Sequence, residues 1–364
     1  MSAVALESQP APDDAPGIRL MTSRRVAIIL FNLGGPDSPQ AVRPFLFNLF
    51  NDKAIIGAPQ PLRFVIAQLI SRGREKLAKA NYAQMGGRSP ILPETQRQAD
   101  ALDAAIARRV SNITFKCFIA MRYWRPFVKD AAKAAEAWGA TDAVLLPLYP
   151  QFSSTTTASS LRAWRRASSL PCSTICCYPH GQKFAEAHAA AILDVWRAAG
   201  EPARPRVLFS AHGLPQRVVD AGDPYQWQVE QSVAAVRKLL PAEWESRTCY
   251  QSRVGPLKWL GPSTEQEIRQ AGRDKAGVIL SPIAFVSEHV ETLVELDIEY
   301  AHIAEGLALP FYLRAPALGA APRFIDALAD LAERALEAPG TLQSEAGGRI
   351  CPAEHGFCPH GSGR

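Results

Sequence analysis

The 364-residue sequence lacks any apolar run approaching eighteen residues, the length of a helix that crosses a bilayer. It also lacks a strong charge of either sign, because 40 basic and 35 acidic residues leave a formal net charge of +5. The basic residues are scattered rather than gathered in a block, so we expect no nucleic-acid partner. Seven cysteines are an odd number on a long chain, which favours a reducing cytoplasm over a disulfide framework.

The first twenty residues lack the basic start and the apolar run of a secretory signal peptide. They contain three prolines and acidic side chains instead. We therefore expect a disordered N-terminal tail over residues 1–22.

The rest of the chain reads as an α/β protein with two domains. Hydrophobic residues make up 47% of the sequence, and the chain is too long for one ordinary core. Short apolar runs alternate with helical stretches, a pattern typical of parallel sheets. Residues 121–151 resemble residues 251–285, which favours two similar α/β halves with the site between them. The expected divisions are a first domain at 23–172, a second at 173–311, a C-terminal helix within 312–340 that packs back on the first domain, and a Cys/His-containing tail at 341–364.

His212 is the first candidate for a functional residue. It follows the apolar strand 206–211 and precedes a glycine. An imidazole at a strand end can bind a metal or take a proton near neutral pH. The alternative is a histidine satisfied by its own loop, so the interpretation depends on a partner of complementary chemistry.

The expected partner is a row of glutamates in the helical segment 286–300. Glu291, Glu295 and Glu299 are spaced i, i+4 and i+8, which places them on one helix face. Like charges four residues apart destabilise a helix by roughly 0.2–0.5 kcal/mol per pair, and the segment contains no lysine or arginine. Such a row can hold a cation or pass protons along a cleft, and a break into π-helix would sharpen its alignment. The alternative is a solvated acidic helix.

Three loops after expected strands carry further candidates. The glycines of "FNLGGPDSP" (31–39) permit a close ligand or merely a tight turn, and they do not form the dinucleotide fingerprint G-x-G-x-x-G. The hydroxyl run of "YPQFSSTTTASS" (149–160) suits an anion such as a carboxylate or simply caps a helix, and it contains no P-loop lysine. "MRYWRPF" (121–127) suits an aromatic, acidic ligand, or else a set of core aromatics beside a surface arginine.

The C-terminal tail has the spacing of metal ligands. Cys351 and Cys358 alternate there with His355 and His360. Two cysteines do not make a four-ligand site, so another ligand is needed, with the upstream candidates Cys172, Cys176 and Cys177. The alternative is a flexible tail with free thiols.

Six motifs, in order between about residues 25 and 340, together resemble the ferrochelatase family. They are "LxNLGGP", "MRYWRPF", "YPQFSSTTTASS", "SAHGLP", "YQSRVGPLKWLGPST" and "PIAFVSEHVETLVELDIEY". The resemblance implies a lyase of haem biosynthesis that inserts Fe²⁺ into protoporphyrin IX and releases two protons. It also implies the chelatase fold: two similar Rossmann-like halves, each a parallel sheet flanked by helices, with the active-site cleft between them.

The resemblance also assigns roles within the candidate site. The family's metal-site histidine, in the motif S-A-H-x-L-P, matches His212, and its essential glutamate, in D/E-H-x-E-T, matches Glu291. Both are therefore predicted as catalytic and metal-binding residues, with Glu295 and Glu299 as a proton or metal relay. We expect the imidazole and the acidic row to face each other across a gap wide enough for the macrocycle. Predicted porphyrin contacts are Leu33, Arg122, Tyr123, Ser153 and Trp259; at Leu33 many relatives have methionine or tyrosine, so a direct ligand role there is excluded.

Two departures from the family affect its other properties. Ala83 and Gln84 stand in the lid segment, about 44–90, where relatives often carry arginines, so contacts to the porphyrin propionates shift. Some ferrochelatases hold a [2Fe–2S] cluster on C-terminal cysteines plus one upstream, whereas His360 replaces a third cysteine here. The candidate cluster ligands are Cys351, Cys358 and His360.

The apolar lid residues 62–70 favour a helix packed on the core. The alternative is peripheral contact with a membrane, at the inner surface of a cytoplasmic enzyme. Oligomeric state is left open. The rival functions are a chelatase for coproporphyrin or cobalt-sirohydrochlorin, a non-catalytic porphyrin carrier, and a nicotinamide dehydrogenase. A carrier would need neither a base nor an acidic helix, and a dehydrogenase would need the missing glycine fingerprint.

Overall fold

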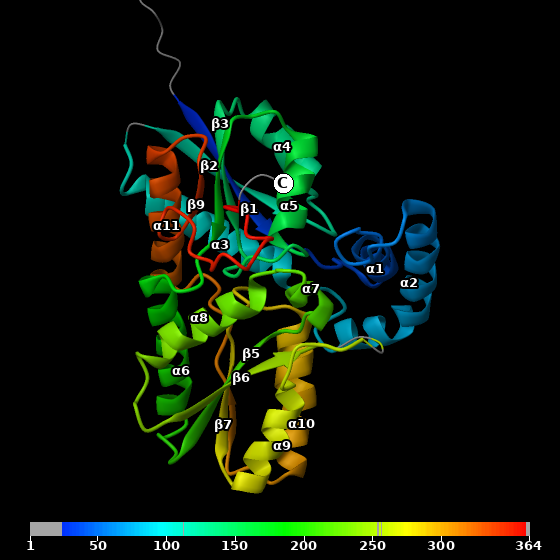
Figure 1. Cartoon of the computed structure of the whole chain (residues 1–364), viewed down its shortest axis with the longest axis vertical. Helices are drawn as coiled ribbons and strands as arrows, with labels where there is room; N and C mark the ends of the chain where they lie inside the picture. The colour runs from blue at the N-terminus through cyan, green and yellow to red at the C-terminus, as the bar shows by residue number, and fades with distance from the viewer. Residues whose placement is uncertain (1–23, 112, 253–254, 256, 362–364) are drawn as a thin grey trace, which may run out of the picture.

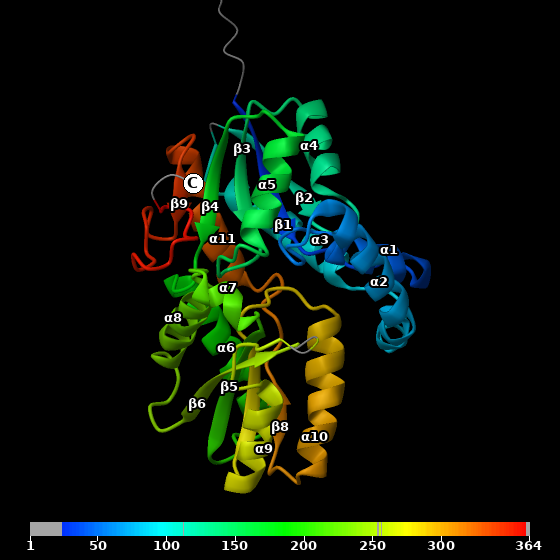
Figure 2. The same cartoon turned by 45° about the vertical axis from the view of Figure 1, so that its right-hand side comes forward.

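The protein is described by a computed structural model that covers residues 24–111, 113–252, 255 and 257–361. The expected tail at 1–22 lies outside the described residues. The described chain forms two parallel sheets, one above the other in the views of Figures 1 and 2. Each sheet is flanked by helices on both faces.

The first sheet has five strands in the order β2-β1-β3-β4-β9, all parallel. Its interior strand β1 is apolar from Val26 to Phe31 because both faces are covered, as is typical of parallel sheets. Residues Val26, Ile28 and Leu30 face one set of helices, and the intervening residues face the other. The strands are β1 (Arg25–Asn32), β2 (Thr114–Met121), β3 (Asp142–Pro147), β4 (Cys172–Cys177) and β9 (Leu342–Ser344).

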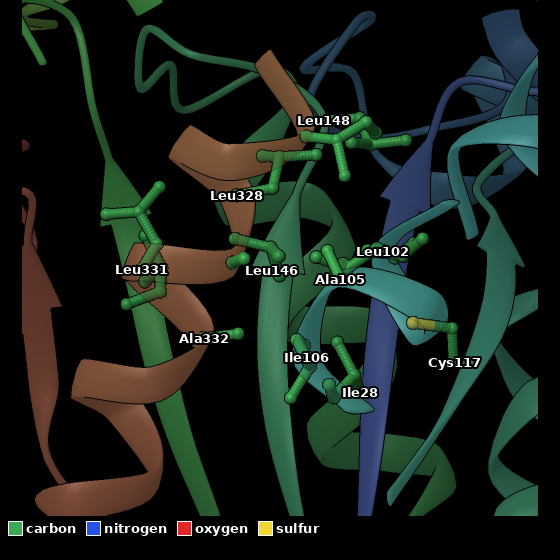
Figure 3. Packing of buried hydrophobic residues seen from close by; sticks show 14 of the residues in the cluster. Ile28, Leu102, Ala105, Ile106, Cys117, Leu146, Leu148, Leu328, Leu331 and Ala332 are labelled. Carbon is green, nitrogen blue, oxygen red and sulfur yellow. The ribbon is translucent and has the colours of Figure 1, made fainter. Parts of the chain in front are cut away.

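Helices α3 (Ile91–Ala107) and α11 (Pro322–Glu337) cover one face of this sheet, and α4 (Val128–Ala137) and α5 (Thr157–Ala167) cover the other. Figure 3 shows Leu102 and Ile106 of α3 and Leu328 of α11 packed over Ile28 and Leu146 of the strands. Each such buried side chain stabilises the fold by about 1.5–3 kcal/mol.

The second sheet has four parallel strands in the order β6-β5-β7-β8. Read from its own first strand, this order repeats that of the first four strands of the other sheet, which supports the similarity seen in the sequence. Helices α6 and α8 cover one face, and α9 and α10 cover the other. The elements are β5 (Pro205–His212), β6 (Glu245–Gln251), β7 (Gly277–Pro282), β8 (Tyr312–Arg314), α6 (Gln182–Ala198), α7 (Gln216–Asp220), α8 (Tyr225–Arg237), α9 (Thr264–Asp274) and α10 (Tyr300–Gly306).

The expected domain boundaries need correction. The division at 172/173 cuts through β4, which belongs to the first sheet. The segment 312–340 is also divided, because β8 joins the second sheet whereas α11 packs against the first. Finally, residues 341–364 are more than a tail, since β9 pairs with β4 as the edge strand of the first sheet. The apolar sequence of a strand predicts that the strand is buried, but it does not predict which sheet the strand joins.

The expected lid forms a helical hairpin beside the two sheets, at the right of Figure 1. A 3₁₀ turn, η1 (Pro39–Ala41), leads into α1 (Val42–Phe50) and then into the long helix α2 (Gln60–Ala83). The inner side of α1 packs in one cluster with Tyr82 and Tyr123. Among the described residues, no helix combines the length and the apolar character needed to cross a membrane.

Candidate active site

His212 is the last residue of β5 and lies at the carboxyl edge of the second sheet, where parallel sheets bind their ligands. Its Nδ1 is 2.6 Å from the carbonyl oxygen of Gly213, so the ring is oriented and Nε2 is left to face the site. The Tyr225 hydroxyl donates to the His212 carbonyl at 3.0 Å. A side chain at Gly213 would come within 2.9 Å of the Gln251 carbonyl, so this close approach requires glycine.

Glu291 lies opposite the free ring nitrogen. Its Oε1 is 3.5 Å from Nε2 of His212, and its Oε2 is 3.6 Å from Nε2 of His289. The His212 and Glu291 side chains are 37% and 27% exposed, so a ligand can reach both from one side. The carboxylate therefore joins two imidazoles, only one of which we singled out from the sequence.

The prediction that a gap separates the imidazole from the acidic row is wrong. His212 and Glu291 both belong to the second half and are in direct contact, which leaves no room for a macrocycle between them. The cause is the topology, because β5 and β7 are neighbours and their carboxyl ends meet at one edge.

The contact with Glu291 changes the protonation of both groups. Burial alone would lower the pKa of His212, but the neighbouring carboxylate raises it to about 9. Burial likewise opposes ionisation of Glu291, yet His212 and His289 hold the pKa of Glu291 far below its usual range. Without a ligand, the pair is therefore an imidazolium beside a carboxylate at neutral pH.

The whole acidic row lies within a π-helix, η2 (Glu291–Glu299), a form that is common at functional sites. Glu295 accepts hydrogen bonds from the Ser252 amide at 2.9 Å and the Tyr300 hydroxyl at 2.7 Å, and also from Gln251. Glu299 is exposed at the outer end of the row. Partial desolvation and the negative charge of Glu295 raise the pKa of Glu299. The row thus runs from the His212 pair outwards to solvent.

Other acidic residues of this segment pair with an arginine, whereas among the described residues those of the row do not. Arg314 forms ion pairs with Glu288 and with Asp297, the latter at 2.6 Å. Among the described residues, no lysine or arginine forms an ion pair with Glu291, Glu295 or Glu299.

Four of the five predicted porphyrin contacts come from the first half, and three of them follow β1 or β2 directly. Leu33 follows β1 and lies partly buried in the cluster that also contains Tyr82 and Val290, the residue before the π-helix. Tyr123 is buried, and its hydroxyl donates to Asp52 at 2.9 Å. Arg122 pairs with the same carboxylate oxygen at 2.7 Å. Leu33 thus lies near the site, whereas the polar groups of the arginine–tyrosine pair already have a partner.

The other two predicted contacts differ in placement. Ser153 is buried and donates to Asp223 at 3.0 Å, an interaction that ties the loop after β3 to the second half. Trp259 lies beside Gly213, and its indole N–H is buried without a partner among the described residues. A role for Trp259 beside the ligand stays a prediction, and Ser153 is placed to support the loop.

Several residues of the site were missed at the level of sequence. His289 and Phe285 lie in the quoted motif "PIAFVSEHVET", and their rings are 4.6 Å apart. Gln251 and Tyr300 hold Glu295. His289 was detectable, because it stands two residues before Glu291; the other three have no distinctive spacing.

The C-terminal cysteines gather beside β4 and α8. The Gln228 amide donates to Cys351 Sγ at 3.1 Å, and Cys177 packs in one cluster with Ile350. A hydrogen bond from Cys351 is the main cause that lowers the pKa of Cys358 to about 6. His360 Nε2 is buried without a partner among the described residues. In the described part of the chain, no group of three histidine, cysteine or acidic side chains is arranged to hold a single metal ion.

Two parallel-sheet halves of similar strand order, each flanked by helices, define a chelatase-type α/β fold. The solved structure of SirB from Bacillus subtilis with Fe³⁺ shares this fold, with a TM-score of 0.50 over 86% of this chain and 97% of that chain, at 12% identity.

The family model for ferrochelatase matches residues 25–336. Ferrochelatases from Phenylobacterium zucineum and Caulobacter vibrioides are each 57% identical to this chain, over 92% and 93% of its length and 97% and 98% of theirs. The chain belongs to the ferrochelatase family. The predicted family, the fold class and the assignment as a lyase that inserts iron into a porphyrin are thereby confirmed.

Proposed function

We propose that this chain inserts Fe²⁺ into protoporphyrin IX at His212 and Glu291, with release of two protons. The observation that carries the proposal is the 3.5 Å contact between His212 Nε2 and Glu291, at the inner end of the glutamate row. A free porphyrin carries two N–H protons, which must leave before the metal binds. A base beside the ring and a carboxylate path to solvent supply what this exchange needs.

The macrocycle lies against the exposed side of the His212–Glu291 pair, with Leu33 of the first half nearby. His212 Nε2 accepts a pyrrole proton or presents the metal once its own proton has passed to the acidic row. Glu295 and Glu299 then exchange that proton or a cation with solvent. The ordering of Glu295 by Ser252 and Tyr300 fixes the position of this relay.

An insertion assay that compares porphyrins tests this proposal. We expect the purified chain to convert protoporphyrin IX and Fe²⁺, or Zn²⁺ as a surrogate, with loss of the free-porphyrin fluorescence. Coproporphyrin III should react more slowly, because the apolar lid favours a ligand with a greasy edge. A chain that binds porphyrin without inserting metal would be a carrier. Faster turnover of coproporphyrin III than of protoporphyrin IX would assign coproporphyrin as the substrate instead.

We further propose that the C-terminal residues hold a [2Fe–2S] cluster. The residues fit such a group: Cys351 and Cys358 interact with each other, Cys177 is close enough to influence Cys351 electrostatically, and His360 presents an unpartnered buried Nε2. A cluster distributes its ligands over two irons and accepts histidine in place of cysteine, so it needs no single-ion geometry. When bound, it would supply a redox-active cross-link between the tail and β4.

Absorbance together with iron and sulfide analysis of anaerobically purified protein tests the cluster. We expect about two irons and two sulfides per chain in the wild type, and Cys351→Ser or Cys177→Ser should remove most of both. Cys172→Ser, on the same strand as Cys177, should leave both contents unchanged. Wild-type protein without visible absorbance or sulfide would contradict the cluster.

We also propose that the enzyme is cytoplasmic and contacts the inner membrane surface through α2. The helix exposes a stripe at i, i+3 and i+7, with Leu62, Val65 and Leu69 all more than half exposed. Leu77 continues the stripe and is 62% exposed. Exposed leucines at this spacing are typical of a face that is covered by another surface.

Sedimentation with anionic lipid vesicles tests the membrane contact. Leu62→Glu combined with Leu69→Glu should weaken vesicle binding by about tenfold or more, because each leucine that enters the lipid contributes about 1.5–3 kcal/mol. Leu239→Glu alters an exposed leucine in the second half and should have little effect. Equal binding by the lid variant and the wild type would contradict the proposal.

A further inference from the structure

A pocket of about 820 Å³ lies between α4, α5 and the turn after α1, apart from the His212 pair. Five cationic side chains and a single carboxylate, that of Asp52, line it. The cations are Lys53, Arg122, Lys129, Arg162 and Arg166. We propose that this pocket binds a small multivalent oxyanion with phosphate or carboxylate groups.

The charges inside the pocket do not balance. The Asp52 carboxylate is only 8% exposed and is already paired with Arg122. Among the described residues, none of the other four cations forms an ion pair with a carboxylate. Arg162 donates a hydrogen bond to the Ser154 carbonyl oxygen at 3.3 Å. The pocket therefore presents several cations whose counter-charge has to come from outside the protein.

Two of these cations crowd each other. Arg162 and Arg166 are four residues apart on α5 and so share one helix face. Partial desolvation and the neighbouring Arg122 and Arg166 lower the pKa of Arg162, and Asp52 offsets them only in part. A bound anion relieves this repulsion, and guanidinium groups bind phosphate or carboxylate with paired, charge-assisted hydrogen bonds.

The shape favours a small molecule over a flat surface. The volume lies within the range of about 300–1,000 Å³ typical of small-molecule sites. Lys53, Lys129, Arg162 and Arg166 are exposed at its rim, whereas Ser159 is buried at its inner side and donates to Asp52 at 2.5 Å. An anion can thus enter from solvent and reach fixed polar groups.

The pocket touches both the lid and the first sheet. Asp52 and Lys53 lie in the turn between α1 and α2, and Arg122 follows β2 directly. An anion held by Lys53 and Arg162 therefore links the base of the lid to α5. This inference is independent of the proposed function, because none of the four unpaired cations belongs to the His212 site.

Isothermal titration calorimetry on the full chain tests the pocket, with pyrophosphate and citrate as separate probes at low salt. We expect at least one probe to bind, and Arg162→Gln combined with Arg166→Gln to weaken it by about tenfold or more, the loss expected for charged hydrogen bonds. The matched control is Arg165→Gln, which removes an exposed cation of α5 that does not line the pocket. Its affinity should stay within about twofold of the wild type.

Three results would overturn the proposal. They are no binding of either probe to the wild type, equal weakening by Arg165→Gln, or binding confined to anionic vesicles with none for the small probes. Metal insertion without added anion should be the same in the double variant and the wild type. Loss of anion binding with full insertion thus separates this pocket from the His212 site.

Discussion

We expect metal insertion to be lost when His212 is replaced by alanine, while porphyrin binding should be retained. The substitution removes the imidazole at the end of β5 that contacts Glu291. The proposed base beside the porphyrin ring is lost with it. Loss of a positioned acid–base group lowers the rate by about 10²–10⁴-fold. Insertion is followed by porphyrin fluorescence, and binding by quenching of that fluorescence in the absence of metal. Glu291→Ala should have an effect of the same order.

His302→Ala is the matched control for this prediction. His302 lies on α10, and its side chain is 87% exposed with only a distant contact to Glu305. The control should insert metal at the wild-type rate. Full activity of His212→Ala, or a loss that comes entirely from weaker porphyrin binding, would refute the role of the imidazole.

The second large effect is a fall in the pKa of His212 when Glu291 is replaced by glutamine. The carboxylate raises that pKa to about 9 against the opposing effect of burial. Without that negative charge, burial lowers the pKa while the Gly213 carbonyl and Glu295 still raise it, so the pKa should fall clearly below about 9. Histidine resonances in a pH titration by NMR measure this directly.

The sign of the shift also predicts a stability change. Because the folded-state pKa is raised, the interaction stabilises the wild type below about pH 6.5, and this contribution is lost as the pH rises through about 9. The Glu291→Gln variant should lack that decline between the two values. Glu299→Gln, at the exposed end of the row, is the control and should leave the His212 pKa near 9. An unchanged pKa in Glu291→Gln would show that the pair is not coupled.

The sequence predicted the core of the site because its signals are local. His212 stands at the end of an apolar strand, and the three glutamates follow the period of a helix. Two similar halves were also evident, since each repeats a strand, a proline loop and a helix. These features depend on neighbours in the chain, which a sequence displays directly.

What the sequence could not supply depends on contacts between distant segments. The pairing of β4 and β9 in one sheet, for example, joins residues on either side of the whole second half. The Asp52 carboxylate accepts hydrogen bonds from Arg122 and Tyr123, although about seventy residues separate Asp52 from these two residues. The direct contact of His212 with Glu291 likewise follows from the order of strands β5 and β7, which no local pattern encodes.

The most direct test of the account is a double-mutant cycle at His212 and Glu291, read out as the rate of Fe²⁺ insertion into protoporphyrin IX. If the two residues act as one unit, the double alanine variant should be no slower than the slower single variant, within about threefold. If they act in separate steps or places, the two losses should multiply. Multiplicative losses would contradict the claim that this imidazole–carboxylate pair is the centre of metal insertion.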